Sequence, residues 1–522
     1  MPSTSAAPRE PVAPTTQSLA GISGPRVVLA IAAVKFLFQL ATASRYGFFI
    51  DEFYYYACSE HLHWGYVDHP PLVVGLMWIA THVFGTSLLG IRVVPALLGG
   101  LLVWIVGTTT RELGGCRFAQ ALAACCVLAA PIYMLNFHYF SMNAVEPVIW
   151  TACAYCAIRA IKGDPRYWIG FGVLCGVGME NKYSIVFFVA GVLLGLLLTS
   201  ARKAFVSIYF WLGMLLALLI FLPNLLWLVH NNYPFLQWRA VMAERGELLN
   251  IPAGTFLFHQ VLWTGATCVV WMAGVIFFLF DKSARRFRFA GIAFVLVIAA
   301  LIALAGKTPY AAPVYGIVFA GGAVFLERVS LQRRWLRVSM ISLFIATGAI
   351  LAPCFVPILP IDKVVAYQNH IPLPLPIQTE TYALNNRFPQ FFSLETGWEQ
   401  MVTTIADVYH GLPPEEQAKA GILTFHYGTA GAVDLLGPKY GLPKAISTAM
   451  SWHEWGPRQY DGQVLILVGF LFQPNYCERW DEGPTIVNPY MYDHVGLKGP
   501  MIHVCHGLRF DLHKQWDGLP WY

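Results

Sequence analysis

Long apolar segments alternate with short polar ones from Val27 to about Pro357. Such segments predict transmembrane helices when they hold roughly 17 to 25 mostly apolar residues. Eleven segments reach or approach this length, at residues 27–44, 92–110, 118–135, 143–160, 167–180, 184–200, 205–229, 257–280, 289–305, 310–326 and 338–358. The pattern therefore predicts a polytopic α-helical membrane protein with about 11 transmembrane helices.

One further apolar segment, residues 70–84, is predicted to lie along the membrane interface instead of crossing it. The argument rests on the basic residues between the spans, because such residues favour the cytoplasmic side. They are Arg9, Arg26, Arg111, Arg117, Arg159, Lys162, Arg166, Arg202, Lys203, Lys282, Arg285, Arg286, Arg288, Arg328, Arg333, Arg334 and Arg337. All of them face the cytoplasm only if residues 70–84 do not cross. The N-terminus is then inside, and the C-terminal region is outside.

The chain changes character after residue 358, and residues 359–522 are predicted to form a separate soluble domain. Residues 360–522 hold 16 of the 29 acidic residues but only 10 of the 34 basic ones. The segment ILTFHYGTAGAVDLLG predicts a strand, a glycine turn and a helix, and QVLILVGF predicts another strand, as in an α/β domain. The glycine turn lacks the full dinucleotide fingerprint, so a nucleotide cofactor is not favoured there.

Composition agrees with a membrane protein, since 57% of the residues are hydrophobic and only 12% are charged. The net charge of +5 comes largely from short loops, so it indicates topology and not affinity for nucleic acid. Residues 1–24 are rich in Ser, Pro, Thr and Ala and are predicted to be disordered, ahead of a transmembrane domain at residues 25–358. Most cysteines lie in apolar spans as packing residues. Cys477 and Cys505 could pair in an oxidising compartment, which the sequence leaves open.

The loop directly behind the first span, residues 45–72, is the candidate reaction centre. It contains Asp51, Glu52, Glu60 and Asp68, together with three histidines. Desolvating a carboxylate is costly, so adjacent acids at the edge of hydrocarbon suggest binding or reaction. The alternative for Asp51 and Glu52 is a helix start, where acids are also favoured. The prolines after His69 would hold the acid and the histidine rigidly, which favours a site.

Further polar residues fall on the same predicted outer side. Glu146 either begins a helix with Pro147 or supplies a second carboxylate that approaches Asp51 from another helix. Lys182 and Lys307 are either interfacial lysines or partners for a phosphate. Tyr310 either belongs to an aromatic belt or donates a hydrogen bond to that phosphate. A sugar or acceptor pocket would use Tyr55, Asp68, His138, Asn143 and Asn181.

No cofactor is indicated with certainty. Asp68 and His69, with His61 and His63, are the candidate ligands for a divalent cation, because imidazole and carboxylate groups bind such ions. Their spacing matches no specific metal motif. A metal dependence is therefore left open at this point.

Five motifs in this order resemble the dolichyl-phosphate-mannose protein mannosyltransferase superfamily. They are DE at 51–52, HPPL at 69–72, NAVEP at 143–147, NK at 181–182 and GKTPYAAPVY at 306–315. Within it, they resemble more closely the bacterial glycosyltransferase family 39 branch and the lipid A aminoarabinose transferases, over roughly residues 27 to 358. Those transferases carry Glu-Lys-Pro-Pro where this chain has Asp68-His69-Pro70-Pro71.

The resemblance implies a GT-C fold and an enzyme that moves a sugar from a polyprenyl-phosphate carrier to an extracytoplasmic lipid, glycan or protein, with inversion. It also implies that Asp51 is the catalytic acid and Glu146 the second acidic residue. Lys182, Lys307 and a protonated His69 would then neutralise the lipid phosphate. The expected location is a bacterial inner membrane. A flippase for a lipid-linked sugar is the alternative from another class, and a structural assembly subunit is a third.

Overall fold

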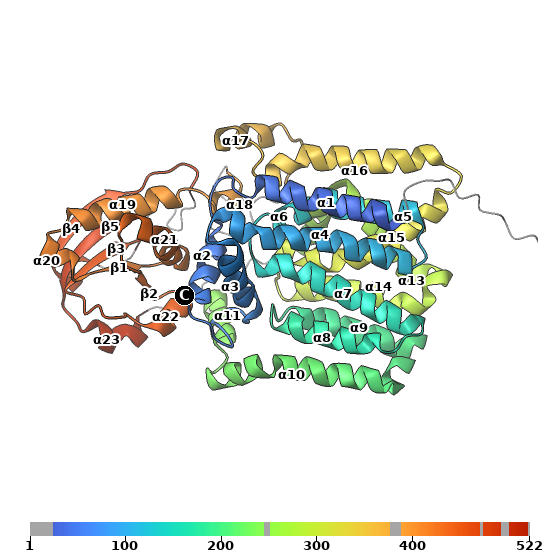
Figure 1. The fold of residues 1–522 in the computed structure, drawn as a ribbon, viewed down its shortest axis with the longest axis horizontal. Coiled ribbons are helices and arrows are strands. Elements are labelled where there is room, and N and C mark those ends of the chain that lie inside the picture. The colour runs from blue at the N-terminus through green and yellow to red at the C-terminus, as the bar shows by residue number, and fades with distance from the viewer. Residues whose placement is uncertain (1–23, 245–250, 376–387, 470–472, 492–500, 520–522) are drawn as a thin grey trace, which may run out of the picture.

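A computed structural model describes residues 24–244, 251–375, 388–469, 473–491 and 501–519. The segment predicted to be disordered lies outside these ranges, apart from Gly24. Two parts are evident along the long axis of the molecule, a helical bundle and a smaller domain that contains a β-sheet (Figure 1). This division follows the change in composition that the sequence shows near residue 358.

The bundle is built from helices that run side by side along this axis (Figure 1). They are α1 (Gly24–Thr42), α4 (Leu88–Glu112), α5 (Arg117–Ala129), α6 (Pro131–Asn136), α7 (Met142–Lys162), α8 (Tyr167–Met179), α9 (Ile185–Leu197), α10 (Ile208–His230), α12 (Ala253–Thr264), α13 (Cys268–Phe280), α14 (Arg288–Ala303), α15 (Tyr315–Val329) and α16 (Arg334–Phe355). Every predicted span overlaps one or two of these helices. The protein is therefore a polytopic helical membrane protein, as predicted.

Fewer segments than predicted are long enough to cross a bilayer in one piece. Among the described residues, eight helical segments have the required length and apolar character, or nine if α9 and the 3₁₀ helix η1 (Ser200–Val206) are one bent span. The other predicted spans fall on the shorter helices α5 with α6, and α8. Pro131 ends α5 because it cannot donate the hydrogen bond that would continue the helix. The short helix α6 then leaves carbonyls of its last turn without helical partners, and Lys35 of α1 donates to one of them, the carbonyl of Tyr133, at 2.9 Å.

Two short helices lie at the end of the bundle that meets the sheet domain. They are α2 (Ile50–Ser59) and α3 (Leu72–Phe84). At about 1.5 Å per residue, a helix of the length of α3 covers roughly 20 Å, less than the hydrocarbon thickness of a bilayer. Figure 1 shows α3 across the end of the bundle and not along it. This arrangement agrees with the prediction that residues 70–84 do not cross the membrane.

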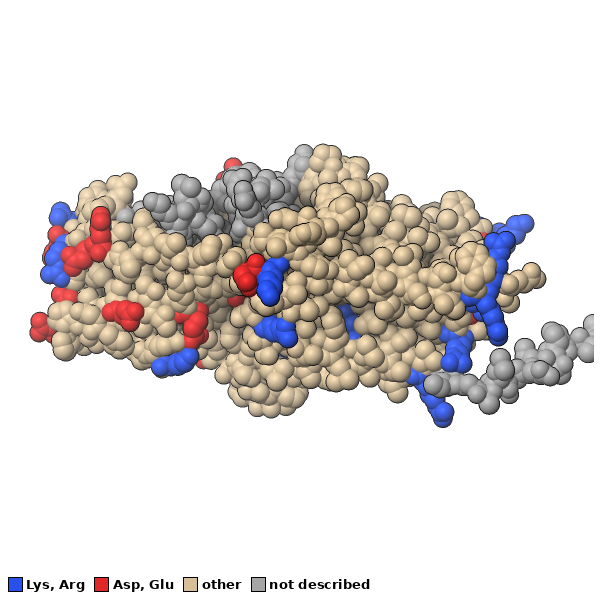
Figure 2. All heavy atoms as spheres, turned by 90° about the horizontal axis from the view of Figure 1, so that it is seen from above, with Lys and Arg blue, Asp and Glu red and all other residues tan. Residues whose placement is uncertain are grey.

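Basic residues gather at the opposite end of the bundle. Figure 2 shows a group of Lys and Arg residues at the end of the bundle away from the sheet domain, whereas most acidic residues of this view lie on the sheet domain, together with some Lys and Arg. Ion pairs join the helix ends there, with Lys162 Nζ 2.6 Å from Glu112 Oε2 and Arg328 Nη1 3.5 Å from Asp281 Oδ2. The 3₁₀ helices η1 and η3 (Lys282–Phe287) carry further members of the predicted clusters. The bundle is therefore polarised in charge along its axis.

The remaining short elements belong to one of the two parts or to the connection between them. They are α11 (Pro234–Glu244), η2 (Gly265–Thr267), η4 (Thr308–Val314), α17 (Ile361–Asn369), α18 (Gln390–Ser393), α20 (Pro414–Gln417), η6 (Gly437–Tyr440), α22 (Ser451–Trp455), η7 (Pro474–Tyr476), α23 (Leu512–Gln515) and η8 (Trp516–Gly518). Of these, η4 and α18 matter most, because both contribute to the site described below.

The sheet domain has a five-stranded mixed sheet with strand order β2-β1-β3-β5-β4. The strands are β1 (Ala420–Thr424), β2 (Ile446–Ser447), β3 (Val464–Val468), β4 (Cys477–Thr485) and β5 (Met501–Leu508). Strands β1, β2 and β3 are parallel, whereas β5 is antiparallel to both β3 and β4. The predicted strands at β1 and β3 and the helix α21 (Tyr427–Leu436) are confirmed, and α19 (Trp398–Gly411) completes the α/β domain.

The structure also settles the pairing of the two cysteines in this domain. Cys477 and Cys505 form a disulfide with a Cα–Cα distance of 5.5 Å, which links the neighbouring strands β4 and β5. The other nine cysteines are free thiols, and most of them are buried. The seven buried ones are therefore packing residues, as predicted for most of the cysteines.

The sheet domain contacts the bundle through α21, which packs closely on α2. Two glycines of α21 allow this approach. A Cβ at Gly428 would lie 2.3 Å from Cγ1 of Ile50, and a Cβ at Gly431 would lie 2.8 Å from the carbonyl oxygen of Phe53. The glycines predicted to form a turn between strand and helix, Gly428 and Gly431, lie instead within α21, where they allow the sheet domain to dock on the bundle.

Candidate active site

A cavity of about 160 Å³ opens where α2, η4 and the sheet domain meet. Four of the residues predicted for the site line it: Asp51, Asn143, Lys307 and Tyr310. They come from α2, the first turn of α7 and the start of η4, which lie far apart in the sequence. A carboxylate, an ammonium group, a phenol and an amide therefore line the same cavity.

Asp51 is placed by the first turn of α2. Phe49 has an extended backbone just before the helix, and the acids follow in the first turn, where the positive end of the helix dipole favours them. The carboxylate is half-buried and accepts a hydrogen bond from the hydroxyl of Tyr427 at 3.0 Å. Both interpretations of this segment thus hold, since Asp51 starts a helix and also lines the cavity.

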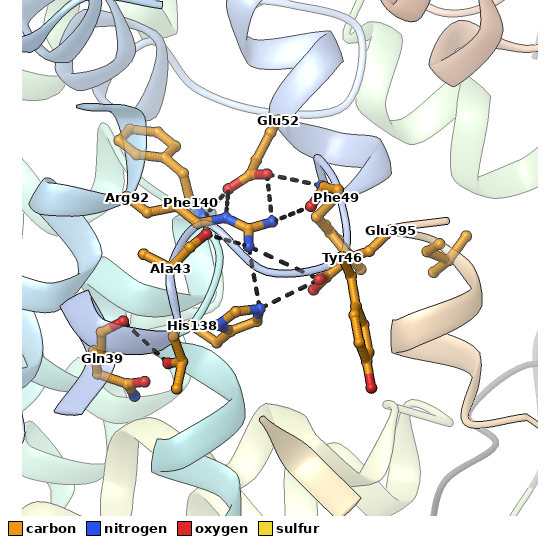
Figure 3. Close-up of polar contacts among 12 residues, drawn as sticks. Gln39, Ala43, Tyr46, Phe49, Glu52, Arg92, His138, Phe140 and Glu395 are labelled. Carbon is orange, nitrogen blue, oxygen red and sulfur yellow. Dashed lines mark hydrogen bonds and ion pairs between the residues drawn. The ribbon is translucent and has the colours of Figure 1, made fainter. Parts of the chain in front are cut away.

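Glu52 has a structural role, which corrects the catalytic role predicted for it. Its carboxylate is fully buried and binds Arg92 through two hydrogen bonds, from Nε at 2.9 Å and from Nη2 at 2.8 Å (Figure 3). The backbone N–H groups of Phe49 and Phe140 donate to the same carboxylate at 2.7 and 2.8 Å. About four lone-pair sites are available on a carboxylate, and these four donors use them. Glu52 does not line the cavity.

His138 belongs to the same buried network and not to the predicted sugar pocket. Its Nε2 lies 3.1 Å from Nη1 of Arg92 and 3.2 Å from Oε2 of Glu395 (Figure 3). Arg92 also donates to the carbonyls of Ala43 and Gly47, at 3.0 and 2.8 Å. Glu395 follows α18, so this network joins the segment that leads into the sheet domain to the bundle. From the sequence, Arg92 was predicted only as the first residue of a span, and its part in this buried network was not predicted.

Glu146 does not share the cavity with Asp51, contrary to the prediction. It is buried, accepts a hydrogen bond from Ser184, and lies 3.4 Å from Nζ of Lys182. Lys182 in turn donates to Asn143 at 2.8 Å, and its Nζ lies 3.8 Å from the ring centre of Tyr310. Both Asn143 and Tyr310 line the cavity, so Lys182 contacts two lining residues without lining the cavity itself. The ion pair between Glu146 and Lys182 forms a layer behind the cavity wall.

The HPPL segment is packed and lies off the cavity. His69 is fully buried, with its Nδ1 2.9 Å from the carbonyl of Pro70, and three tyrosine rings surround it. This corrects its predicted contact with phosphate. Asp68 accepts a hydrogen bond from Tyr54 at 2.9 Å and also lies away from the cavity lining.

Two other predicted pocket residues are buried behind the cavity. Tyr55 does not line it, and burial raises the pKa of its phenol, with a further contribution from the charge of Asp51. Asn181 donates to the carbonyl of Met142 at 3.0 Å and holds the turn after α8 against the start of α7. Both residues support the site without lining it.

The described part of the chain contains no group of three or more His, Cys, Asp or Glu side chains placed to hold a metal ion. His69 Nε2 and Asp68 Oδ1 are 3.9 Å apart. His61 stacks on Trp455 and His63 packs near Trp227, so the four candidate ligands do not converge. The predicted divalent cation stays a prediction.

Several cavity residues were not identified from the sequence. They are Tyr139, Trp263, Gln390, Phe391, His426 and Tyr427. Four of the six lie in α18 or at the start of α21, within the region predicted to be a separate domain. The sequence contains one signal for the residues at the start of α21. Gly428 and Gly431 lie three residues apart on one helix face, and such a pair allows a second helix to approach closely.

Comparison with known proteins finds a matching family model and distant relatives. Residues 68–227 match the family model described as dolichyl-phosphate-mannose-protein mannosyltransferase. The lipid A galacturonosyltransferase RgtD of Rhizobium johnstonii is 25% identical over 217 residues, which is 40% of this chain and 45% of the relative. An undecaprenyl phosphate-α-4-amino-4-deoxy-L-arabinose arabinosyl transferase of Pseudomonas fluorescens is 26% identical over 33% of this chain and 32% of its own length. The chain thus matches less than half the length of these curated relatives.

The fold extends further than these sequence matches. The crystal structure of ArnT from Cupriavidus metallidurans bound to undecaprenyl phosphate superposes with a TM-score of 0.59 at 13% identity, covering 91% of this chain and 97% of that one. The apo structure of the same protein gives a TM-score of 0.55 at 14% identity, covering 92% of this chain and 97% of that one. The family model over residues 68–227 thus supports the predicted resemblance to the dolichyl-phosphate-mannose protein mannosyltransferases, and the whole chain shares the fold of ArnT.

Proposed function

We propose that the protein is a membrane glycosyltransferase that moves a sugar from a polyprenyl-phosphate carrier to an extracytoplasmic acceptor, with inversion at the anomeric carbon. The observation that carries the proposal is the cavity that brings Asp51 together with Lys307, Tyr310 and Asn143. A carboxylate can accept a proton, and an ammonium group can neutralise a phosphate. The relatives whose names include undecaprenyl phosphate or polyprenol-phosphate-mannose support a lipid-linked donor.

The reaction follows from this arrangement of groups. Asp51 accepts the proton of an acceptor hydroxyl while the acceptor oxygen forms a bond to the anomeric carbon. The bond between that carbon and the phosphate oxygen breaks, and the electron pair leaves with the polyprenyl phosphate. Negative charge on the departing phosphate grows in the transition state, so Lys307 and the phenol of Tyr310 stabilise it most at that point.

Two properties of the chain support an extracytoplasmic location for the cavity, in a bacterial inner membrane. The basic residues gather at the far end of the bundle, which favours the cytoplasm for that end and for the N-terminus. The sheet domain carries the disulfide between Cys477 and Cys505, and such bonds persist in oxidising compartments. Charge and disulfide thus favour the same orientation.

A donor panel tests the proposal. Purified protein is incubated with polyprenyl-phosphate sugars that differ in the sugar (hexoses, uronic acids and aminopentoses), with envelope fractions as acceptors. Release of polyprenyl phosphate with labelling of an acceptor is expected for at least one donor. In proteoliposomes, a labelled donor that only changes leaflet would identify a flippase and would contradict the proposal.

A further inference from the structure

The sheet domain reaches the wall of the cavity through the first residues of α21. His426 and Tyr427 both line the cavity, and the Tyr427 hydroxyl donates to Oδ1 of Asp51 at 3.0 Å. These residues are separated by 376 positions in the sequence. The group assigned as catalytic base is therefore held by a different domain from the one that carries it.

Packing restricts the movement of Tyr427. The ring of His426 lies 4.3 Å from its ring, and the ring of Tyr54 lies 5.3 Å away. The backbone N–H of Gly428 donates to Nδ1 of His426 at 3.0 Å, which caps α21 and fixes that imidazole. A tyrosine confined in this way presents its hydroxyl to the carboxylate at a nearly constant position.

A second contact holds the sheet domain in the same place. Glu395 is buried, and its Oε2 lies 3.2 Å from Nε2 of His138 and 3.8 Å from Nη1 of Arg92 (Figure 3). A Cβ at Gly47 would lie 2.2 Å from the carbonyl oxygen of Glu395, so the backbones meet closely there. The sheet domain is thus anchored by a buried charge network and by the contact between α21 and α2.

We propose that the sheet domain completes the active site and that Tyr427 is a positioning residue for Asp51. Its hydrogen bond orients the carboxylate toward the acceptor hydroxyl and stabilises the charged form that accepts the proton. The inference rests on the proposed function for the catalytic role of Asp51. The contact itself has a consequence that can be measured without turnover.

Tyr427→Phe tests the inference, because it removes the hydroxyl and keeps the ring. Tyr409→Phe is the matched control, since it removes a hydroxyl that donates to the carbonyl of Gln417 at 3.2 Å in the same domain, away from the cavity. The full-length variants are labelled with a water-soluble carbodiimide and an amine across a pH series. The Asp51 peptide is then quantified by mass spectrometry.

Carbodiimide reacts with the protonated carboxyl, so the pH midpoint of labelling reports the ionisation of Asp51. In Tyr427→Phe this midpoint should rise by about one pH unit, because a hydrogen bond to the charged form is lost. In Tyr409→Phe it should not move. An unchanged midpoint in Tyr427→Phe would overturn the inference, whether or not the wild type turns over any donor.

Kinetics give a second readout once a donor is known. Tyr427→Phe should lower kcat about tenfold with little change in KM for the donor, and the acid limb of its pH profile should move to higher pH. A loss of activity without movement of that limb would assign Tyr427 a purely structural role and would contradict the inference. If the wild type consumes no donor while the labelling midpoint shifts, only the proposed function fails.

Discussion

Adjacent residues in this protein have different roles, as Asp51 and Glu52 illustrate. Consecutive positions on a helix point about 100° apart, so one carboxylate of the pair faces the cavity and the other faces the bundle. Asp51 meets Tyr427 at the cavity wall, whereas Glu52 meets Arg92 in the interior. The role of each carboxylate follows from this difference in direction and not from a difference in chemistry.

Glu52→Gln should destabilise the protein strongly, because it leaves the buried guanidinium of Arg92 without its main counter-charge. Removing one partner of a buried ion pair costs about 3 to 5 kcal/mol. We expect a large fall in the melting temperature in detergent. Glu60→Gln is the matched control, since its ion pair with Lys444 is exposed and such pairs contribute about 1 kcal/mol or less. Equal melting temperatures for the two variants would contradict the structural role of Glu52.

Helices α2 and α21 form the contact through which the sheet domain enters the site. Gly431→Ala should disturb it, because the added Cβ would meet backbone atoms of Phe53 at under 3 Å. Backbone cannot move aside as a flexible side chain can, so α21 should shift away from α2 and carry Tyr427 with it. We expect a clear loss of donor turnover, with the sheet domain itself still folded.

Gly411→Ala serves as the control for this prediction. Gly411 ends α19 in the same domain, and no heavy atom lies within 4 Å of the Cβ position there. This variant should keep wild-type turnover. Wild-type turnover in Gly431→Ala as well would show that the close packing of α2 and α21 is not needed for activity.

Asp434, also on α21, gives the sheet domain a pH-dependent stability. Burial raises the pKa of its carboxyl from 3.8 to about 6, although the backbone N–H of Ala445 donates to it. The protonated form is thus favoured in the folded protein, so its stabilising contribution is present at low pH and is lost as pH rises through about 6.

Asp434→Asn removes this titration and keeps an oxygen that can accept the hydrogen bond. The melting temperature of the variant relative to wild type should therefore increase from about pH 4 to about pH 6 and level off above that pH. The shift in the pKa of Asp434 corresponds to a change in the free energy of unfolding of roughly 3 kcal/mol at most. A difference between variant and wild type that stays constant across this pH range would exclude Asp434 as the titrating group.

For the whole molecule, the features that depend on the local pattern of apolar and polar residues were predictable from the sequence. The apolar segments predicted the helices of the bundle. The positions of the basic clusters predicted that residues 70–84 do not cross the membrane, and the short length of α3 agrees with this. The strand at β1 followed by α21 was recognisable as an α/β segment. The helices and strands depend on short stretches of sequence, and the topology depends on the distribution of basic residues along the chain. Both can be obtained from a single sequence.

The site was predicted only in part, because its contacts connect residues far apart in the chain. Asp51, Asn143, Lys307 and Tyr310 line the cavity as expected. Glu146 was expected beside Asp51, but its ion pair with Lys182 keeps it behind the wall. The glycines that follow Tyr427 indicate that another helix packs closely there, but they do not identify α2 as that helix, since the contact depends on how two domains dock.

Turnover by Asp51→Asn is the most direct test of the central claim, that the cavity holds a catalytic base at Asp51. With the donor identified by the panel, kcat should fall at least about 100-fold, because general base catalysis typically contributes 10² to 10⁴. The melting temperature should stay near that of wild type. Asp407→Asn, which changes an exposed aspartate on α19, should turn over normally. Normal sugar transfer by Asp51→Asn would contradict the account.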